Sequence, residues 1–321
     1  MTKTLNTPLR TSSPQIDVGK RLKITVLAGG PSSEREVSLA SGSAVAAALV
    51  QRGHAVTVRD IDEGNLSALE VPTDFAFIAL HGAFGEDGQV QEQLARRGIA
   101  FCGSDAAASA LAMNKAGTKA RLMEADLPTP RYLVHHHRQD RRSWGCWKLP
   151  LVVKPVASGS SVDTFIVRDQ PGLQEALERL GERYGCALVE QYVRGPELTV
   201  AVLDRTALPV CQIVTQREFY DYQAKYVDDD TTYEFDIDLP EALLHRVQEM
   251  SLHAFDCLGC RDFARVDWMI DEATMQPFLL EINTIPGFTS HSLLPKAAKR
   301  VGIGFEELCD RIVRLGMERE S

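Results

Sequence analysis

Residues 263–270, Phe-Ala-Arg-Val-Asp-Trp-Met-Ile, and residues 277–283, Pro-Phe-Leu-Leu-Glu-Ile-Asn, are the stretches that decide the expected fold and site. Each is a short, largely apolar run, which predicts strands over residues 263–270 and 277–282. Side chains two positions apart on a strand point to the same face. Arg265 is therefore expected beside Asp267, and Glu281 beside Asn283.

These paired side chains fit two different arrangements. Asp267, Glu281 and Asn283 offer only hard oxygen ligands, which suits Mg²⁺ shared with substrate phosphates. Without a metal, Arg265 could instead form a salt bridge to Asp267 or Glu281, while Asn283 caps a turn. The pattern alone favours neither arrangement.

Outward from these strands, the chain divides into a tail, residues 1–20, and three predicted units, residues 21–113, 114–193 and 194–321. The tail is rich in Thr, Ser and Pro and is expected to be flexible. The first unit alternates strands with helices, which predicts a parallel α/β sheet covered on both faces. Its strands are expected over residues 22–28, 54–61 and 75–80, and its helices over residues 37–50 and 89–97.

The two later units predict α+β structure. In the middle unit we expect an antiparallel sheet, with strands over residues 151–155, 164–167 and 187–193 and helices over residues 114–125 and 172–184. In the last unit we expect two further strands, over residues 198–203 and 209–214, and helices over residues 241–257, 292–301 and 305–315.

Three segments carry weaker patterns. Residues 135–148 show no clear period, so His135, His136 and His137 are interpreted as part of a solvated loop rather than a metal site. Residues 216–235 are polar but hold four tyrosines, which favours an ordered functional loop. Cys257 and Cys260 form one C-x-x-C without a second ligand pair at zinc spacing, so a structural role is preferred.

Composition excludes several classes of protein. With 321 residues, 44% hydrophobic and 25% charged, the chain suits two or three globular domains. The net charge of −9 argues against a general nucleic-acid binder. No apolar run approaches the roughly 20 residues that cross a bilayer, so no membrane partner is expected. The seven cysteines form no paired framework, which indicates a reduced, cytoplasmic setting.

Three more segments could hold anions or small ligands. Lys154-Pro155 precedes the small-residue loop 158–161, whose N–H groups could cradle phosphate, although such loops are commonly plain connections. Gly29-Gly30 and residues 32–38 occupy a strand-to-helix turn of the kind that favours anions. Residues 281–292 combine a turn, polar side chains and a helix start.

Taken in order, these segments resemble the D-alanine–D-alanine ligases of the ATP-grasp superfamily, from about residue 22 to 315. The resemblance is carried by short matching stretches: Gly29-Gly30, 33–38, 80–82, 85–88, 113–115, 153–155, 159–162, 195–197, 219–222, 224–226, Arg265-x-Asp267 and 281–293. Each stretch alone is a modest sign of the family, but the whole set in this order is highly specific for it. It implies an ATP-grasp fold with an N-terminal parallel α/β domain, a small central α+β domain and a C-terminal α+β domain.

The resemblance also implies a role for each matching residue. ATP phosphates would meet Lys115, Lys154, Ser160 and Ser161; adenine would meet Glu190 and the backbone near Val193; and the ribose would meet Glu197. Two Mg²⁺ ions (Mn²⁺ is an alternative) would be held by Asp267, Glu281 and Asn283.

The first D-alanine would be bound through its ammonium by Glu34, with His81 near its carboxylate. Oxyanion charge would be stabilised by Arg265 and the Gly287 amide, and the second D-alanine's carboxylate would be bound by Ser292 and Leu293, with Lys225 nearby. Tyr226, hydrogen-bonded with Glu34 and Ser160, would shut the site.

The implied reaction converts ATP and two D-alanines into dipeptide, ADP and phosphate through an acyl phosphate, for cell-wall precursor synthesis. We expect a homodimer in the cytoplasm. Two alternatives stay open: a related ligase that uses D-serine or D-lactate, and an ATP-binding protein that has lost turnover. The chain departs from the family pattern at Ser158, Asp163 and Gln191, which affects the expected nucleotide loop and adenine pocket but leaves the predicted metal and substrate residues in place.

Overall fold

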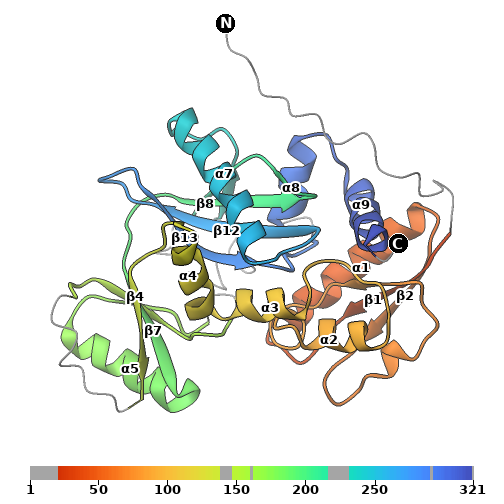
Figure 1. Ribbon diagram of the computed structural model, residues 1–321, viewed down its shortest axis with the longest axis horizontal. Helices are drawn as coiled ribbons and strands as arrows, with labels where there is room; N and C mark the ends of the chain where they lie inside the picture. Colours follow the sequence, from red (N-terminus) through yellow and green to blue (C-terminus); the bar gives the residue numbers. More distant parts are fainter. Residues whose placement is uncertain (1–20, 138–146, 160–161, 216–230, 290–291, 320–321) are drawn as a thin grey trace, which may run out of the picture.

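The computed structural model describes residues 21–137, 147–159, 162–215, 231–289 and 292–319. Three sheets organise these residues (Figure 1). The expected flexible tail, residues 1–20, lies outside the described residues.

The N-terminal sheet is parallel, as predicted, with strand order β2-β1-β3. Its strands are β1 (Lys23–Ala28), β2 (Ala55–Asp60) and β3 (Phe75–Ile78), and its helices are α1 (Arg35–Gln51) and α2 (Gln89–Arg96), with a short 3₁₀ helix at Ser67–Leu69. Helix α1 approaches β1 closely, because a Cβ placed on Gly42 would lie 2.5 Å from the Ala28 Cβ. This packing fixes the start of α1, which carries Glu34.

The central sheet is antiparallel, with strand order β4-β7-β5-β6. Its strands are β4 (Tyr132–His136), β5 (Leu151–Lys154), β6 (Phe165–Val167) and β7 (Cys186–Gln191), and helix α5 (Gln170–Tyr184) packs against it. The expected solvated loop at residues 135–148 is wrong at its start. His135 and His136 belong to β4 and pair with β7, and His135 is buried.

The C-terminal sheet runs β11-β10-β8-β12-β13, with β9 paired to β8. Its strands are β8 (Glu197–Leu203), β9 (Thr206–Ala207), β10 (Cys211–Val214), β11 (Thr232–Glu234), β12 (Phe263–Ile270) and β13 (Pro277–Asn283). The helices are α7 (Glu241–Cys257), α8 (Leu293–Arg300) and α9 (Phe305–Glu318). The two strands quoted at the outset are therefore neighbours, with Arg265 opposite Asn283 and Asp267 opposite Glu281.

Helices α3 (Ala106–Met113) and α4 (Lys115–Glu124) connect the first two sheets and meet at Asn114. Asn114 ends α3 in an extended conformation and caps α4, its side chain accepting from the Gly117 N–H at 3.0 Å. Helix α3 was not predicted. Leu122, in α4, packs in the core of the C-terminal sheet.

The N-terminal and C-terminal sheets share one apolar core. Phe288 lies edge-on to Phe77 at 5.3 Å between ring centroids, and edge-on to Phe263 at 5.6 Å. The central sheet has its own smaller core, and it extends away from the other two sheets beside α4 in Figure 1.

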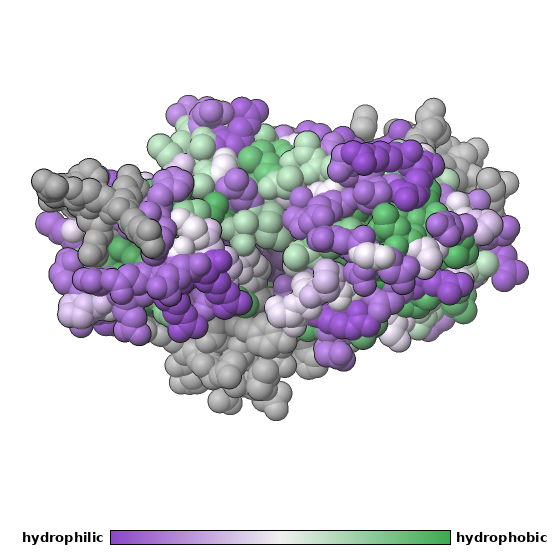
Figure 2. Space-filling model, turned by 90° about the horizontal axis from the view of Figure 1, so that it is seen from below, coloured by the Kyte–Doolittle hydropathy of each residue, from purple (hydrophilic) through white to green (hydrophobic). Residues whose placement is uncertain are grey.

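Hydrophilic side chains cover much of the face in Figure 2, with smaller apolar patches between them. No helix in the described part of the chain is both long and apolar enough to span a membrane.

Candidate active site

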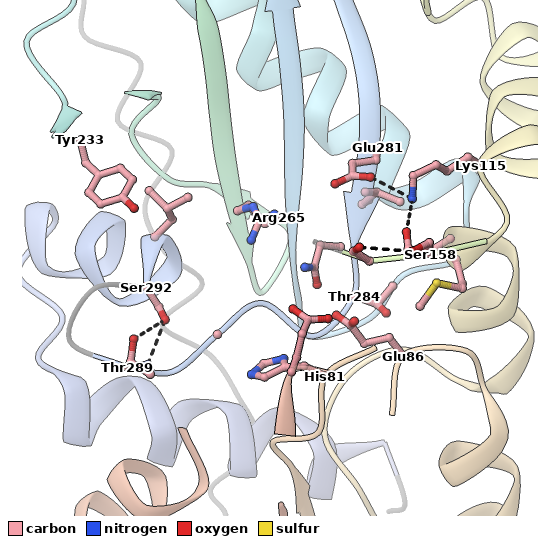
Figure 3. Close-up of a pocket in the computed structure, with 18 residues that line it drawn as sticks. His81, Glu86, Lys115, Ser158, Tyr233, Arg265, Glu281, Thr284, Thr289 and Ser292 are labelled. Atoms are coloured by element: carbon pink, nitrogen blue, oxygen red, sulfur yellow. Dashed lines mark hydrogen bonds and ion pairs between the residues drawn. The ribbon is translucent and has the colours of Figure 1, made fainter. Parts of the chain in front are cut away.

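A hollow opens where the three units meet, and every unit contributes to its wall (Figure 3). The N-terminal unit supplies Glu34, His81 and Glu86. The α3–α4 junction and the loop after β5 supply Met113, Lys115, Ser158 and Gly159. The C-terminal unit supplies Tyr233, Arg265, Glu281, Asn283, Thr284, Gly287, Thr289, Ser292 and Leu293.

Glu34 is buried where the N-terminal unit meets the loop after β5. A Cβ on Gly159 would lie 3.0 Å from Glu34 Oε2, and one on Gly82 would lie 3.2 Å from it. Gly82 also has a φ of +68°, which glycine adopts without strain. Glycines at these two positions therefore let the backbone pass close to the carboxylate.

His81 is held as a neutral ring by buried neighbours. Its Nδ1 lies 3.2 Å from the Ile285 carbonyl and its Nε2 lies 3.3 Å from Ser41 Oγ. A proton on Nδ1 satisfies the carbonyl and leaves Nε2 to accept from Ser41. Burial lowers the pKa of His81 despite the opposing influence of Glu34.

Glu86, a buried acid on the wall of the hollow, has a strongly raised pKa. Burial, followed by the nearby Glu34 charge, raises its pKa to about 8. Its Oε2 accepts from the Gly82 N–H at 2.6 Å. Glu86 is therefore mainly protonated at neutral pH, so the charge at this end of the hollow resides chiefly on Glu34.

On the facing strands, Arg265 pairs with Asp267 and Asn283 caps a turn. Arg265 donates to both Asp267 oxygens, at 2.9 and 2.8 Å, and Thr199 donates to Asp267 Oδ1 at 2.7 Å. Asn283 Oδ1 accepts from the Ile285 N–H at 2.9 Å and so caps the turn after β13. No cluster of three or more His, Cys, Asp or Glu side chains suited to a metal occurs in the described ranges.

Lys115 connects Glu281 to the loop after β5. Its Nζ lies 3.1 Å from Glu281 Oε2 and donates to the Ser158 carbonyl at 2.7 Å (Figure 3). The side chain is 11% exposed. It places a positive charge on the wall of the hollow beside Glu281, one of the predicted oxygen ligands.

A second lysine, Lys154, lies deeper and is paired with Glu190. Its Nζ is 2.6 Å from Glu190 Oε2, and Lys119 Nζ is 2.5 Å from Oε1 of the same carboxylate. Burial lowers the pKa of Lys154, but attraction to Glu190, Glu281 and Glu197 outweighs it and holds this pKa above its ordinary value. Lys154, Glu190, Val193 and Glu197 are not among the residues that line the hollow.

At the far end, the start of α8 is joined to the preceding turn. Ser292 Oγ accepts from the Thr289 N–H at 3.0 Å and lies 2.9 Å from Thr289 Oγ1. A Cβ on Gly287 would lie 2.6 Å from Ser292 Oγ. Glycine at position 287 therefore leaves room for this hydroxyl and keeps the neighbouring backbone open to the hollow.

The same architecture occurs in known proteins. The family model described as D-ala D-ala ligase C-terminus matches residues 122–314. A D-alanine–D-alanine ligase of Syntrophotalea carbinolica is 44% identical over 297 residues, covering 91% of this chain and 95% of the relative. The Bacillus anthracis D-alanine–D-alanine ligase complexed with ATP superposes with a TM-score of 0.83 at 35% identity, covering 94% and 99% of the two chains.

This chain belongs to the D-alanine–D-alanine ligase family. It has the family's ATP-grasp fold and is an ATP-dependent ligase. The VanG D-Ala:D-Ser ligase of Enterococcus faecalis also superposes, with a TM-score of 0.81 at 27% identity, covering 92% of this chain and all of that one.

The site residues expected from the family resemblance fall into three groups, according to where the structure places them. The hollow brings together Glu34, His81, Lys115, Arg265, Glu281, Asn283, Gly287, Ser292 and Leu293. Asp267 lies just behind, bonded to Arg265. Glu190 in β7 is paired with Lys154, Val193 follows β7, and Glu197 begins β8. Four expected residues, Ser160, Ser161, Lys225 and Tyr226, lie outside the described residues, as does most of the polar stretch 216–235.

Several lining residues were not predicted as site residues. Glu86 belongs to the matching stretch Gly85-Glu86-Asp87-Gly88 but was not expected to be a site residue. The fold buries its carboxyl group near the Glu34 charge, which the sequence pattern does not indicate. Tyr233 belonged to the tyrosine-rich segment that was singled out. Met113 and Thr289 were noticed only within matching stretches, and nothing in their residue types alone points to a site.

The three departures from the ligase pattern also have clear positions. Asp163 adopts a φ of +54° and accepts from Arg179 at 3.0 Å, Arg183 at 2.7 Å and the Tyr184 hydroxyl at 2.8 Å. It therefore fastens the end of the loop after β5 to α5. Ser158 uses its carbonyl to bind Lys115, and Gln191 is exposed at the end of β7.

Proposed function

We propose that this chain joins two D-alanines into D-alanyl-D-alanine and converts ATP to ADP and phosphate. The main support for this proposal is that all three units of the ligase fold contribute residues to the wall of one hollow. At one end of that hollow the buried carboxylate of Glu34 carries the charge that would attract an ammonium group. At the other end, the Gly287 turn and the start of α8 present backbone N–H groups suited to carboxylate or oxyanion charge.

The chemistry explains why ATP is needed. A carboxylate is a poor electrophile because its leaving group would be oxide. Transfer of the ATP γ-phosphoryl group to the first D-alanine's carboxylate gives an acyl phosphate, whose leaving group is phosphate. The free amine of the second D-alanine then attacks the acyl carbon. Placing the two reactants correctly can be worth roughly 7–11 kcal/mol of the barrier.

Each side chain has one proposed task. Glu34 binds the first ammonium and His81 lies near its carboxylate, as a neutral ring that adds no charge. Lys115 and Lys154 neutralise phosphate, while Glu190, the backbone at Val193 and Glu197 serve adenine and ribose. Arg265 and the Gly287 N–H stabilise oxyanion charge, and Ser292 and Leu293 bind the second carboxylate. On the family resemblance alone, Ser160 and Ser161 serve the ATP phosphates, Lys225 serves the substrate, and Tyr226 shuts the site.

Magnesium is proposed at Asp267, Glu281 and Asn283. The donor chemistry supports it, because these are hard oxygen ligands on two paired strands. In the structure Arg265 is paired with Asp267 and Lys115 with Glu281. When bound with ATP, the metal would spread the transferring phosphoryl charge. The homodimer and the cytoplasmic location are proposed as well, on the family resemblance and the cysteine content.

A related ligase specificity is the second candidate, favoured by the likeness to the D-Ala:D-Ser ligase. The test is a product analysis with D-alanine, D-serine and D-lactate in competition, from pH 6 to about 9. An amine attacks only when unprotonated, so dipeptide formation is expected to rise across this range. D-alanyl-D-alanine as the main product supports the proposal, whereas mainly D-alanyl-D-serine or depsipeptide would assign the chain to the second candidate.

A further inference from the structure

Lys119 is a completely buried lysine with no task in the reaction described above. It lies in α4, one turn after Lys115, and its side chain is 0% exposed. Burying an ammonium group is costly unless it is paired and hydrogen-bonded. Its partners therefore indicate what the side chain contributes.

Those partners come from three different elements. Lys119 Nζ lies 2.5 Å from Glu190 Oε1, in β7, and donates to Thr129 Oγ1 at 2.6 Å. Thr129 in turn donates to the Leu279 carbonyl in β13 at 2.8 Å. The ammonium also lies 5.8 Å from the centre of the Tyr132 ring. Lys119 is thereby fixed where α4, the central sheet and the C-terminal sheet meet.

Glu190 divides its two oxygens between two lysines. Oε1 faces Lys119, and Oε2 is 2.6 Å from Lys154. Lys119 has no exposed surface, whereas the Lys154 side chain is 11% exposed. Both ammonium groups face this one carboxylate, and only that of Lys154 is exposed and can meet a bound anion.

We propose that Lys119 is a positioning residue that holds Glu190 Oε1, so that Lys154 binds only Oε2 and keeps its remaining N–H groups for the nucleotide phosphates. This rests on the proposed role of Lys154 in the ligase reaction. Without Lys119, both Glu190 oxygens are free to turn onto Lys154, which neutralises it more completely and draws it away from the phosphates.

The test is a double-mutant cycle on ATP affinity, measured by calorimetry without D-alanine. Lys119→Met and Lys154→Met are each expected to weaken ATP binding by roughly tenfold or more. Because Lys119 acts through Lys154, adding Lys119→Met to Lys154→Met is expected to change the affinity by less than about twofold. In steady-state kinetics, Lys119→Met should raise the KM for ATP and leave the KM for D-alanine nearly unchanged.

Additive losses in the cycle, or unchanged ATP affinity in Lys119→Met, would overturn the proposal. Lys119→Gln keeps hydrogen-bond donors without the charge and replaces Lys119→Met in the cycle if thermal unfolding shows that the methionine variant is not folded. Lys119→Arg keeps the cation and is expected to recover part of the affinity. Failure of the proposed function has a different signature, since the wild-type chain would then show no D-alanine-dependent phosphate release at all.

Discussion

At the residue scale, several carboxylates in and around the hollow are paired with cations of the protein. Asp267 is bonded to Arg265, Glu281 to Lys115, and Glu190 to two lysines. Each of these three carboxylates thus has a protein cation beside it.

Glu281→Gln tests the oxygen ligands directly. The neutral amide is expected to lower kcat by about 100-fold or more, because it would hold Mg²⁺ more weakly and the metal would supply the charge that stabilises the transferring phosphoryl group. The melting temperature should change little, since the ion pair with Lys115 is partly exposed. Glu272→Gln removes an exposed acid paired with Arg194 and serves as the matched control, with wild-type kinetics expected. Unchanged turnover in Glu281→Gln at saturating Mg²⁺ would refute the assignment.

Glu86→Gln tests the raised carboxyl pKa. The folded protein keeps this proton until about pH 8, whereas a free glutamate loses it near pH 4.3. Between these values the unfolded chain binds fewer protons, so the contribution of Glu86 to stability falls as pH rises. Denaturant unfolding should show the wild type losing stability relative to Glu86→Gln from about pH 5 to 8. Parallel pH profiles for the two proteins would mean that the Glu86 pKa is not raised.

At the scale of elements, long apolar or amphipathic runs were the easiest to predict, whereas the short strands β9 and β11 were not predicted. Residues 263–270 and 241–257 form β12 and α7 with the predicted bounds, because each is a clear apolar or amphipathic run. Helix α3 was missed since Ala-Ala-Ala-Ser-Ala-Leu-Ala-Met has almost no polar face to give a period. Strand β4 was missed because its histidines suggested a polar loop, while pairing with β7 decides its conformation.

Asp163 offers a test at the joint between β6, α5 and the loop after β5. Asp163→Gly and Asp163→Ala both lose the contacts with Arg179, Arg183 and Tyr184. Only alanine is strained at a φ of +54°, by about 1 kcal/mol. Chemical denaturation should therefore find Asp163→Ala less stable than Asp163→Gly by about that amount. Equal stability of the two variants would show that backbone strain at this position is negligible.

At the scale of the whole molecule, the shared core makes one site from distant segments. Phe77, Phe263 and Phe288 pack together, which brings His81 and Ile285 within hydrogen-bonding distance across 204 positions of sequence. Residue patterns, together with the family resemblance, named nine of the eighteen residues that line the hollow. They could not predict that Lys119 and Lys154 share Glu190, because that contact depends on how α4 packs between two sheets.

The central claim is that ATP turnover is coupled to joining two D-alanines. The most direct measurement follows phosphate release and D-alanyl-D-alanine together, by a phosphate assay and mass spectrometry, in reactions with ATP, Mg²⁺ and D-alanine. The account predicts one dipeptide for each phosphate, with neither product when D-alanine is omitted. Phosphate released without dipeptide, or ATP bound without turnover in the presence of D-alanine, would contradict it.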